Sequence, residues 1–409
     1  MILRALFSRL LSAQTLVLGL SFAAGAEDSP RWRGRDANGI VKETGWLSAW
    51  PATGPKVLWK ASLGTGFSTI TVSGGRAFSM GNKSNAERVE ADFVYCFDAE
   101  KGDLIWEKSY PEPLDPKNFE GGPGASPTVD DGRVFTFSRS GKLFCFDVAK
   151  GTVIWSNDLP KTTGATKPEW GCASSPFVAG DLVIVNIGRA GTAVNKATGQ
   201  VVWTTGREKA GYSSAVPFEQ GGQPAVLLLG EADLFAVRIA DGRILWNFPR
   251  KTFRGMNIAD PVVVSPAEVF LASGYNYGSE LIRIVDGKAV GVWKSANMRN
   301  HFNSSVLWQG FVFGFDESTF CCLEVKTGEV KWSERSLGKG SVVLADGKLM
   351  ALSERGELVL AEATPDGFKP ISRAHILSNK CWTTPVLANG CVYARNAGGS
   401  AVCLDLRGR

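Results

Sequence analysis

Two adjacent cysteines, Cys321 and Cys322, are the residues whose types and spacing most directly suggest chemistry in this sequence. A disulfide between neighbouring cysteines closes a small, strained ring that can exchange electrons or serve as a platform for a ligand. Both lie in the segment STFCCLEVKTGEVKW, which ends at Trp332. If this segment recurs along the chain, its residues are better explained as parts of a structural repeat.

The segment does recur, at intervals typical of a repeat protein. Five copies place a glycine four residues before a tryptophan, and a looser sixth copy ends at Trp293. The five tryptophans are Trp106, Trp155, Trp203, Trp246 and Trp332. With Trp59 and Trp293 included, successive tryptophans are 39 to 49 residues apart, which leaves room for about four short strands. Each copy predicts two strands joined by a tight turn with glycine at positive φ, and a tryptophan that docks on the next unit.

A second pattern shows how many repeat units the chain contains. Small residues, an apolar strand, a Gly or Asp turn and another apolar strand occur eight times, starting at Ser68, Ala125, Ser174, Ser213, Ala259, Ser304, Ser341 and Thr383. The strand around Trp59 has no partners before it, while the last unit ends before reaching its own tryptophan. The first strand therefore completes the last unit, which hides two exposed sheet edges. The sequence predicts an all-β fold: an eight-bladed β-propeller of four-stranded antiparallel blades, closed by an N-terminal strand.

The repeat also explains the adjacent cysteines. Cys322 occupies the same repeat position as Cys96, Cys145 and Cys403, where a small apolar residue fits a buried strand. Neighbouring residues on a strand point to opposite faces, which works against a bond between Cys321 and Cys322. We therefore interpret the pair as structural. The spacing of the other cysteines does not imply a disulfide.

The N-terminus predicts export. Arg4 and Arg9, the apolar stretch 10–23 and the small residues 24–26 form a signal peptide over residues 1–26. We expect a secreted, periplasmic or cell-envelope protein with no later transmembrane segment. Residues 27–55 are predicted to be an arm packed on the propeller, and residues 56–409 the propeller itself. A formal net charge of +5 does not favour a nucleic-acid partner, and we expect a monomer.

The motif D-x-x-x-G-x-x-x-W, at Asp98 to Trp106 and Asp147 to Trp155, resembles the PQQ-like (quinoprotein-type) β-propeller repeat family. The opening stretch 32–64 resembles secreted bacterial members of it, and the resemblance covers essentially all of the chain after the leader. That family contains both enzymes and non-catalytic scaffolds, so the resemblance implies the fold and leaves the function open. The propeller of the outer-membrane assembly machinery, which binds partner proteins, is the nearest functional analogue, although no lipid-anchor cysteine follows the apolar leader.

Quinoprotein members of the family imply a different site. Their quinone, PQQ, lies between a tryptophan and a ring disulfide, beside calcium, a basic aspartate and an arginine. This chain has no ring disulfide in a loop, has nearly minimal blades and lacks a C-x-x-C-H haem motif. With only His301 and His375, a multi-histidine metal site is excluded. A small PQQ-dependent alcohol or aldose oxidoreductase with calcium is thus the alternative, and the main prediction includes neither cofactor nor metal.

The loops that precede the inner strands are expected to converge on one face, called here the entrance face. Five of them carry a cation: Lys209, Arg254, Arg299, Lys339 and Lys380. Clustered cations would focus positive potential, which suits an anionic ligand, an acidic glycan or a partner peptide. The other candidate ligand-binding residues on this face are Glu120, Glu169, Trp170, Tyr212, Asn257, Asp260, His301, Asn303 and Trp382. We predict a non-catalytic binding or scaffold propeller, with a polyanion-binding propeller as a second alternative and no assigned catalytic residue.

Overall fold

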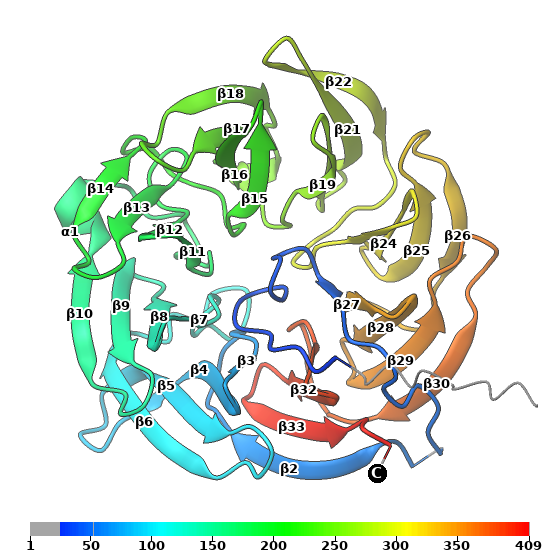
Figure 1. Ribbon diagram of the computed structural model, residues 1–409, viewed down its shortest axis with the longest axis horizontal. Helices are drawn as coiled ribbons and strands as arrows, with labels where there is room; N and C mark the ends of the chain where they lie inside the picture. Colours follow the sequence, from blue (N-terminus) through cyan, green and yellow to red (C-terminus); the bar gives the residue numbers. More distant parts are fainter. Residues whose placement is uncertain (1–24, 52, 409) are drawn as a thin grey trace, which may run out of the picture.

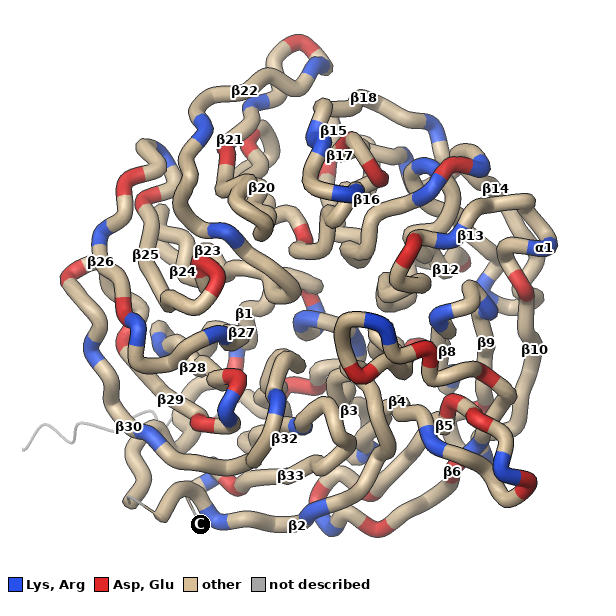
Figure 2. Tube along the Cα trace, turned by 180° about the vertical axis from the view of Figure 1, so that it is seen from behind, with Lys and Arg blue, Asp and Glu red and all other residues tan. Residues whose placement is uncertain are grey.

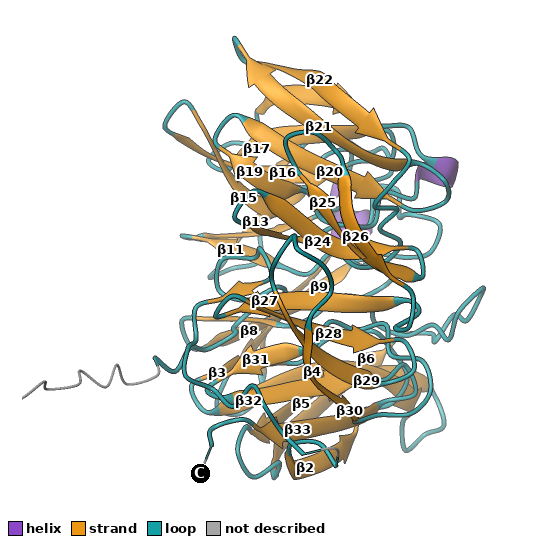
Figure 3. Ribbon diagram, turned by 90° about the vertical axis from the view of Figure 1, so that its right-hand side faces the viewer, coloured by secondary structure: helices purple, strands orange, loops and turns teal. Residues whose placement is uncertain are grey.

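The computed structural model of the protein describes residues 25–51 and 53–408 and forms a ring of eight β-sheets (Figure 1). Figure 3 shows the ring from the side, with loops on both of its faces. Neighbouring strands within a blade are antiparallel and consecutive along the chain, apart from two strands of the N-terminal region. The predicted eight-bladed propeller is therefore confirmed. The predicted leader lies outside the described residues except for Gly25 and Ala26.

Each of the first four blades consists of four strands that are consecutive along the chain. Blade 1 contains β3 (Thr71–Ser73), β4 (Arg76–Ser84), β5 (Glu90–Asp98) and β6 (Leu104–Pro111). Blade 2 contains β7 (Thr128–Asp130), β8 (Arg133–Phe137), β9 (Lys142–Asp147) and β10 (Val153–Asp158). Blade 3 contains β11 (Phe177–Ala179), β12 (Leu182–Val185), β13 (Thr192–Asn195) and β14 (Val201–Thr204). Blade 4 contains β15 (Val216–Gln220), β16 (Gln223–Leu229), β17 (Asp233–Arg238) and β18 (Ile244–Pro249).

The last four blades include the two N-terminal strands. Blade 5 contains β19 (Val262–Ser265), β20 (Glu268–Ser273), β21 (Gly278–Val285) and β22 (Lys288–Ser295). Blade 6 contains β23 (Val306–Trp308), β24 (Phe311–Asp316), β25 (Thr319–Glu324) and β26 (Val330–Glu334). Blade 7 contains β27 (Gly340–Ala345), β28 (Lys348–Ser353), β29 (Glu357–Glu362), β30 (Pro370–His375) and the added β1 (Ile40–Val41). Blade 8 contains β31 (Val386–Ala388), β32 (Cys391–Arg395), β33 (Ser400–Asp405) and β2 (Lys56–Ser62).

Two helical turns lie in connections between blades, α1 (Leu159–Thr163) and a 3₁₀ turn (Phe253–Gly255). In the described part of the chain, no helix is long and apolar enough to cross a bilayer. The middle strands are apolar on both faces because each is packed between two neighbouring blades. Val183, Ile184 and Val185 on β12, for example, are all fully buried. The core is thus divided into layers between blades, and the loops on the two faces are free to carry function.

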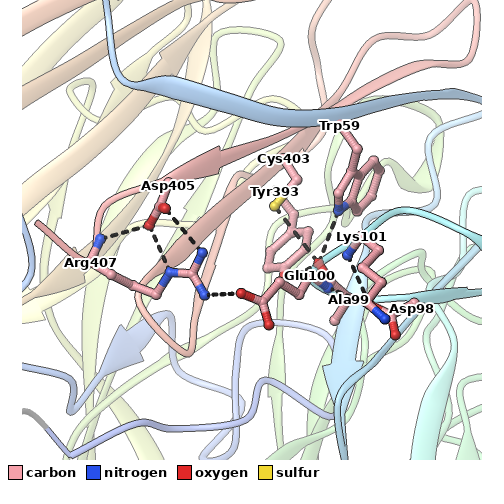
Figure 4. Close-up of polar contacts among 9 residues, drawn as sticks. All are labelled: Trp59, Asp98, Ala99, Glu100, Lys101, Tyr393, Cys403, Asp405 and Arg407. Atoms are coloured by element: carbon pink, nitrogen blue, oxygen red, sulfur yellow. Dashed lines mark hydrogen bonds and ion pairs between the residues drawn. The ribbon is translucent and has the colours of Figure 1, made fainter. Parts of the chain in front are cut away.

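The ring closes where its two ends meet (Figure 4). Strand β2 pairs with β33 in antiparallel register, with Trp59 opposite Cys403. The indole N–H of Trp59 donates to the carbonyl of Ala99 in blade 1 at 2.9 Å, and the Tyr393 hydroxyl donates to the same oxygen at 3.1 Å. The predicted closure is therefore confirmed.

Five of the six other repeated tryptophans make the same kind of contact between blades. The indole N–H of Trp106 donates to Val148 O at 3.1 Å, and that of Trp332 to Thr364 O at 2.8 Å. Trp155, Trp203 and Trp293 also donate to a backbone carbonyl of the following blade, whereas Trp246 donates to the Gln220 side chain. In the five regular copies, the glycine lies under the preceding tryptophan: a Cβ on Gly102 would lie 2.4 Å from Cγ of Trp59. The glycine therefore provides space for an indole as well as a positive φ.

Cys321 and Cys322 lie on β25 with their side chains in different core layers. The Cys321 sulfur is 3.8 Å from that of Met298, whereas Cys322 is opposite Trp332 on the neighbouring strand. Burial raises the pKa of each thiol to about 12. All eight cysteines of the sequence are buried, free thiols.

Residues 27–43, called here the axial segment, run through the centre of the ring (Figure 1). Both ends lie at the face opposite the entrance face, where the Glu43 carboxylate accepts hydrogen bonds from the backbone N–H groups of Asn389 and Gly390. Within the ring, the carbonyls of Ser29 and Pro30 accept from Val72 N and Val129 N, each at 2.8 Å.

Four further contacts hold the axial segment. The Arg31 side chain donates to Val178 O, the Trp32 side chain to Asp260, and the Arg33 side chain to Ser305 O. Strand β1 then adds to β27 in parallel, with Ile40 opposite Leu344. These contacts reach seven of the eight blades and satisfy inner-strand groups that would otherwise face the axis. The pairing of β1 was not predicted.

Candidate functional site

The entrance-face loops enclose a cavity of about 300 Å³ on the axis of the ring. Eight Phe, Tyr and Trp side chains line it: Trp32, Phe67, Phe119, Trp170, Tyr212, Tyr275, Phe302 and Trp382. Phe302 and Trp382 are stacked with their ring centres 3.9 Å apart, and Trp170 and Tyr212 pack at 6.2 Å. The cavity is thus a predominantly aromatic chamber of a size that suits a small ligand or a single side chain.

A ring of small polar side chains lies below these aromatic residues. Thr69 N donates to Ser126 Oγ at 3.0 Å, and Ser126 N and Ser175 N each donate to the serine of the next blade at 2.9 Å. Ser214 N donates to Asp260 Oδ1 at 2.8 Å, and Asp260 N donates to Ser304 Oγ at 2.8 Å. The remaining two positions of this inter-blade ring are Ser341 and Thr384. All neighbouring blades except blades 6 and 7 are therefore bonded to one another at these positions, around the base of the cavity.

Asp260 is the exception in the inter-blade ring, because the other seven positions carry a hydroxyl. Its second carboxylate oxygen, Oδ2, accepts from Trp32 Nε1 at 2.7 Å. Burial raises the pKa of Asp260 above its ordinary value, while nearby Arg33 acts in the opposite direction. A carboxylate at this position therefore holds the axial segment, and Trp32 lines the inner end of the cavity.

Three of the five predicted cations, Arg254, Lys339 and Lys380, lie at the rim of the cavity, and each has an acidic partner there. Arg254 pairs with Glu169 and lies over the Trp170 ring, 5.3 Å from its centre. Lys380 pairs with Glu120 at 2.7 Å and lies 4.2 Å above the Trp382 ring.

Lys339 and Arg299 also have acidic partners. Lys339 is 3.5 Å from Glu317, and Arg299 is 2.6 Å from Asp316. Figure 2, seen from behind the view of Figure 1, shows acidic and basic residues interspersed. Of the five cations expected to form a positive arc, Lys209 alone has no ion pair among the described residues. The arc therefore carries mixed charge, because Glu169, Asp316, Glu317 and Glu120 supply carboxylates beside its cations.

His301 lines the cavity in a neutral form. Its Nδ1 lies 3.1 Å from Lys339 Nζ, and an ammonium group can only donate, so Nδ1 is the acceptor. Burial and Lys339 lower the pKa of His301 to about 4. The proton of the neutral ring is therefore on Nε2, which makes no hydrogen bond to any described residue.

The structure divides the predicted site residues into three groups. Trp170, Tyr212, Asp260, His301 and Trp382 line the cavity. The rim contains Glu120, Glu169, Arg254, Lys339 and Lys380. Asn257, Arg299, Asn303 and Lys209 do not line it, and Asn257 is buried with its amide donating to Gly230 O and Arg250 O.

Sequence reasoning missed five aromatic lining residues, namely Trp32, Phe67, Phe119, Tyr275 and Phe302. A positional signal for part of this set exists. Each blade contributes one residue to the inter-blade ring. The residue two positions earlier in the sequence lines the cavity in seven of the eight blades, and Lys339 of blade 7 is the exception. Phe67 and Phe302 follow this rule, as do Tyr212 and Trp382. Trp32 and Phe119 lie outside the repeat and have no such signal.

The lining residues do not match the quinone site that the resemblance implies. Cys172 is the single cysteine of the lining, and Phe302 covers a face of the Trp382 indole. Asp260 is engaged by Trp32, and the described residues contain no cluster of three or more His, Cys, Asp or Glu side chains suited to a metal. PQQ also carries several carboxylates, whereas Arg139, the cation of the lining, is already paired with Asp115 at 3.0 Å. The arrangement favours an uncharged occupant.

Comparison with known proteins gives the family. A family model described as outer membrane protein assembly factor BamB matches residues 90–334. Among solved structures, BamB from Moraxella catarrhalis is 17% identical with a TM-score of 0.60, over 87% of this chain and 98% of that chain. The quinohemoprotein alcohol dehydrogenase from Comamonas testosteroni is 11% identical with a TM-score of 0.64, over 93% and 81%. A europium-containing methanol dehydrogenase is 11% identical with a TM-score of 0.62, over 90% of each chain.

Identities this low show a shared fold and nothing more. No curated protein matches the sequence. The family model, in contrast, matches more than half of the chain. The chain therefore belongs to the PQQ-like repeat family of β-propellers, whose matching model is described as outer membrane protein assembly factor BamB.

Proposed function

We propose that this chain is a non-catalytic binding propeller of the cell envelope, which holds a partner protein on its entrance face. The observation that carries the proposal is the aromatic cavity at the centre of that face. Apolar surface that is open to a partner contributes roughly 25 cal/mol per Å² when it is buried. The family, named for a factor in outer-membrane protein assembly, and the predicted leader support an envelope location.

The state of the reactive groups in the cavity supports a non-catalytic role. The Asp260 carboxylate is occupied by Trp32 and Ser214, and His301 is neutral and bonded to Lys339. Burial raises the pKa of Cys172 to about 12, so it is a thiol rather than a nucleophilic thiolate. The carboxylate of Asp260, the imidazole of His301 and the thiol of Cys172 are thus each engaged or deactivated. A polyanion-binding role has less support, since four of the five predicted cations are ion-paired.

Site-specific photocrosslinking in cells tests the proposal. A photoreactive phenylalanine replaces Phe119 in the cavity wall, and in a control chain it replaces Val153, which is 54% exposed on an outer strand. We expect a discrete protein adduct from position 119 that is absent from position 153. Equal adduct patterns at the two positions, or none at position 119 in exported and folded protein, would show that the cavity does not hold a partner protein.

A further inference from the structure

We infer that the cavity is a blind receptor for one uncharged aromatic side chain of the partner, and that Trp32 of the axial segment closes its inner end and sets its depth. The inference rests on the proposed function and names the chemistry by which the entrance face would recognise its partner. It depends on three features: what closes the cavity, which charges line it and which hydrogen-bonding groups are left open.

The axial segment makes the cavity blind. It enters from the opposite face and returns to that face, so the chain itself fills the channel below the cavity. Trp32 is the member of this segment that lines the cavity, and it is held by the 2.7 Å bond to Asp260. Arg33, beside it, is buried and donates to the carbonyls of Asn38 and Ser305, each at 2.7 Å. An occupant can therefore enter only from the entrance face, and the indole of Trp32 limits how far it reaches.

The charges of the lining are already balanced. Arg139 is paired with Asp115, Asp260 is bonded to Trp32 beside Arg33, and His301 is neutral. A charged group that entered would lose its hydration and find no free counterion, which strongly disfavours it. An uncharged group carries no such penalty.

The shape and the donors of the cavity favour an aromatic residue of a polypeptide. A volume of about 300 Å³ with aromatic walls suits a flat ring, which gains from offset or edge-to-face contacts beyond its buried area. One donor in the lining remains open: Nε2 of His301, which has no hydrogen-bond partner among the described residues. A peptide carbonyl next to the ring supplies the acceptor that it lacks.

Amino-acid probes test the ligand class. The N-acetyl amides of tryptophan, tyrosine, phenylalanine, leucine, lysine and aspartate are titrated into the full chain, with binding followed by ligand-detected NMR. We expect the aromatic amides to bind at least about threefold more tightly than the leucine amide, because ring contacts add to area burial. The lysine and aspartate amides are expected to show no saturable binding. Equal affinity for all six probes would contradict the inference, as would tighter binding of PQQ than of any aromatic amide.

A pair of tryptophan variants tests the role of Trp32. Trp32→Ala enlarges the cavity, so the affinity ratio of a naphthylalanine amide to the phenylalanine amide should rise about fivefold or more over wild type. Trp50→Ala is the matched control: Trp50 is also half-buried and N-terminal, but it packs near Ser372, away from the cavity. Trp32→Phe, which keeps a ring, covers the case in which the alanine variant does not fold. An unchanged ratio in folded Trp32 variants, or an equal shift in Trp50→Ala, would overturn the assignment.

Partner binding and aromatic selectivity can be lost independently of each other. A protein adduct at position 119 with no selectivity for aromatic amides would leave the binding function in place and refute the aromatic-receptor inference. Absence of both the adduct and the selectivity would refute both.

Discussion

Trp32 and Asp260 share a hydrogen bond of 2.7 Å although 228 positions separate them along the chain. The bond joins the axial segment to blade 5 at the single position of the inter-blade ring where a carboxylate replaces a hydroxyl. Through it, a residue outside the repeat becomes part of the cavity that the repeat builds.

Replacing Asp260 with serine restores the hydroxyl found elsewhere in the ring and removes the acceptor for Trp32. We expect the free energy of unfolding to fall by about 2–4 kcal/mol, because a buried indole N–H loses its partner and buried Arg33 loses its nearby charge. Urea unfolding measures this loss, and limited proteolysis should show faster cleavage within residues 27–43. Ser304→Ala is the control, since it removes an acceptor of the same ring without touching Trp32. A proteolysis pattern equal to that of the control would contradict the role given to Asp260.

Substituting two glycines of the repeat separates the cost of backbone strain from the cost of displacing an indole. Gly102 and Gly287 have similar φ values of +75° and +73°, but a Cβ would meet the Trp59 indole only at Gly102. Gly287→Ala should therefore cost about 1 kcal/mol for backbone strain, and Gly102→Ala about 2–4 kcal/mol because the indole must also move. Equal losses in urea unfolding would mean that the tryptophan contact adds nothing to closure.

Asp92 should make the stability of the ring depend on pH. It is fully buried, accepts from Asn82 Nδ2 at 2.8 Å, and burial raises its pKa to about 7. Because the folded-state pKa lies above the unfolded one, the stabilisation is complete below about pH 4 and is lost as the pH rises through 7. The upper bound of this change is roughly 4 kcal/mol. Urea unfolding at pH 5 and at pH 8 should show a larger loss for wild type than for Asp92→Asn, and parallel behaviour of the two would exclude Asp92 as the source.

Adding PQQ and calcium should leave the protein unchanged. The Trp382 indole is stacked on Phe302, and the described lining has no free cation for the carboxylates of the quinone. We expect no saturable quenching of tryptophan fluorescence beyond that of a free tryptophan amide, and no dye-linked oxidation of alcohols or aldoses. Saturable quenching that disappears in Trp382→Ala would instead support the quinoprotein alternative.

The fold was predictable because it repeats. The glycine–tryptophan spacing defined the blades, and the unpaired strand at Trp59 matched the incomplete unit that ends with β33. The aromatic wall was predictable only in part: Tyr212 and Trp382 were named, whereas Phe67 and Phe302, at the same repeat position, were not.

The remainder of the site depends on contacts that local pattern does not encode. Glu317 and Asp316 belong to hairpin turns of blade 6, so their pairing with Lys339 and Arg299 emerges only when neighbouring loops meet. The axial segment binds largely through backbone groups, such as the carbonyls of Ser29 and Pro30, and these carry no sequence signature. Sequence analysis could place the candidate cations on one face, but it could not assign their partners or find the residue that closes the cavity.

The pairing of β2 with β33 also has a consequence for biogenesis. Residues 56–62, which leave the ribosome early, cannot find their partner until residues 400–405 have been made. Until then the nascent propeller is an open arc whose two terminal sheet edges are unpaired. Because the closing contacts are so distant along the chain, closure of the ring is slow. During that interval the protein is most exposed to aggregation and to proteases, so its yield in the cell should depend on chaperones that shield unfinished sheets.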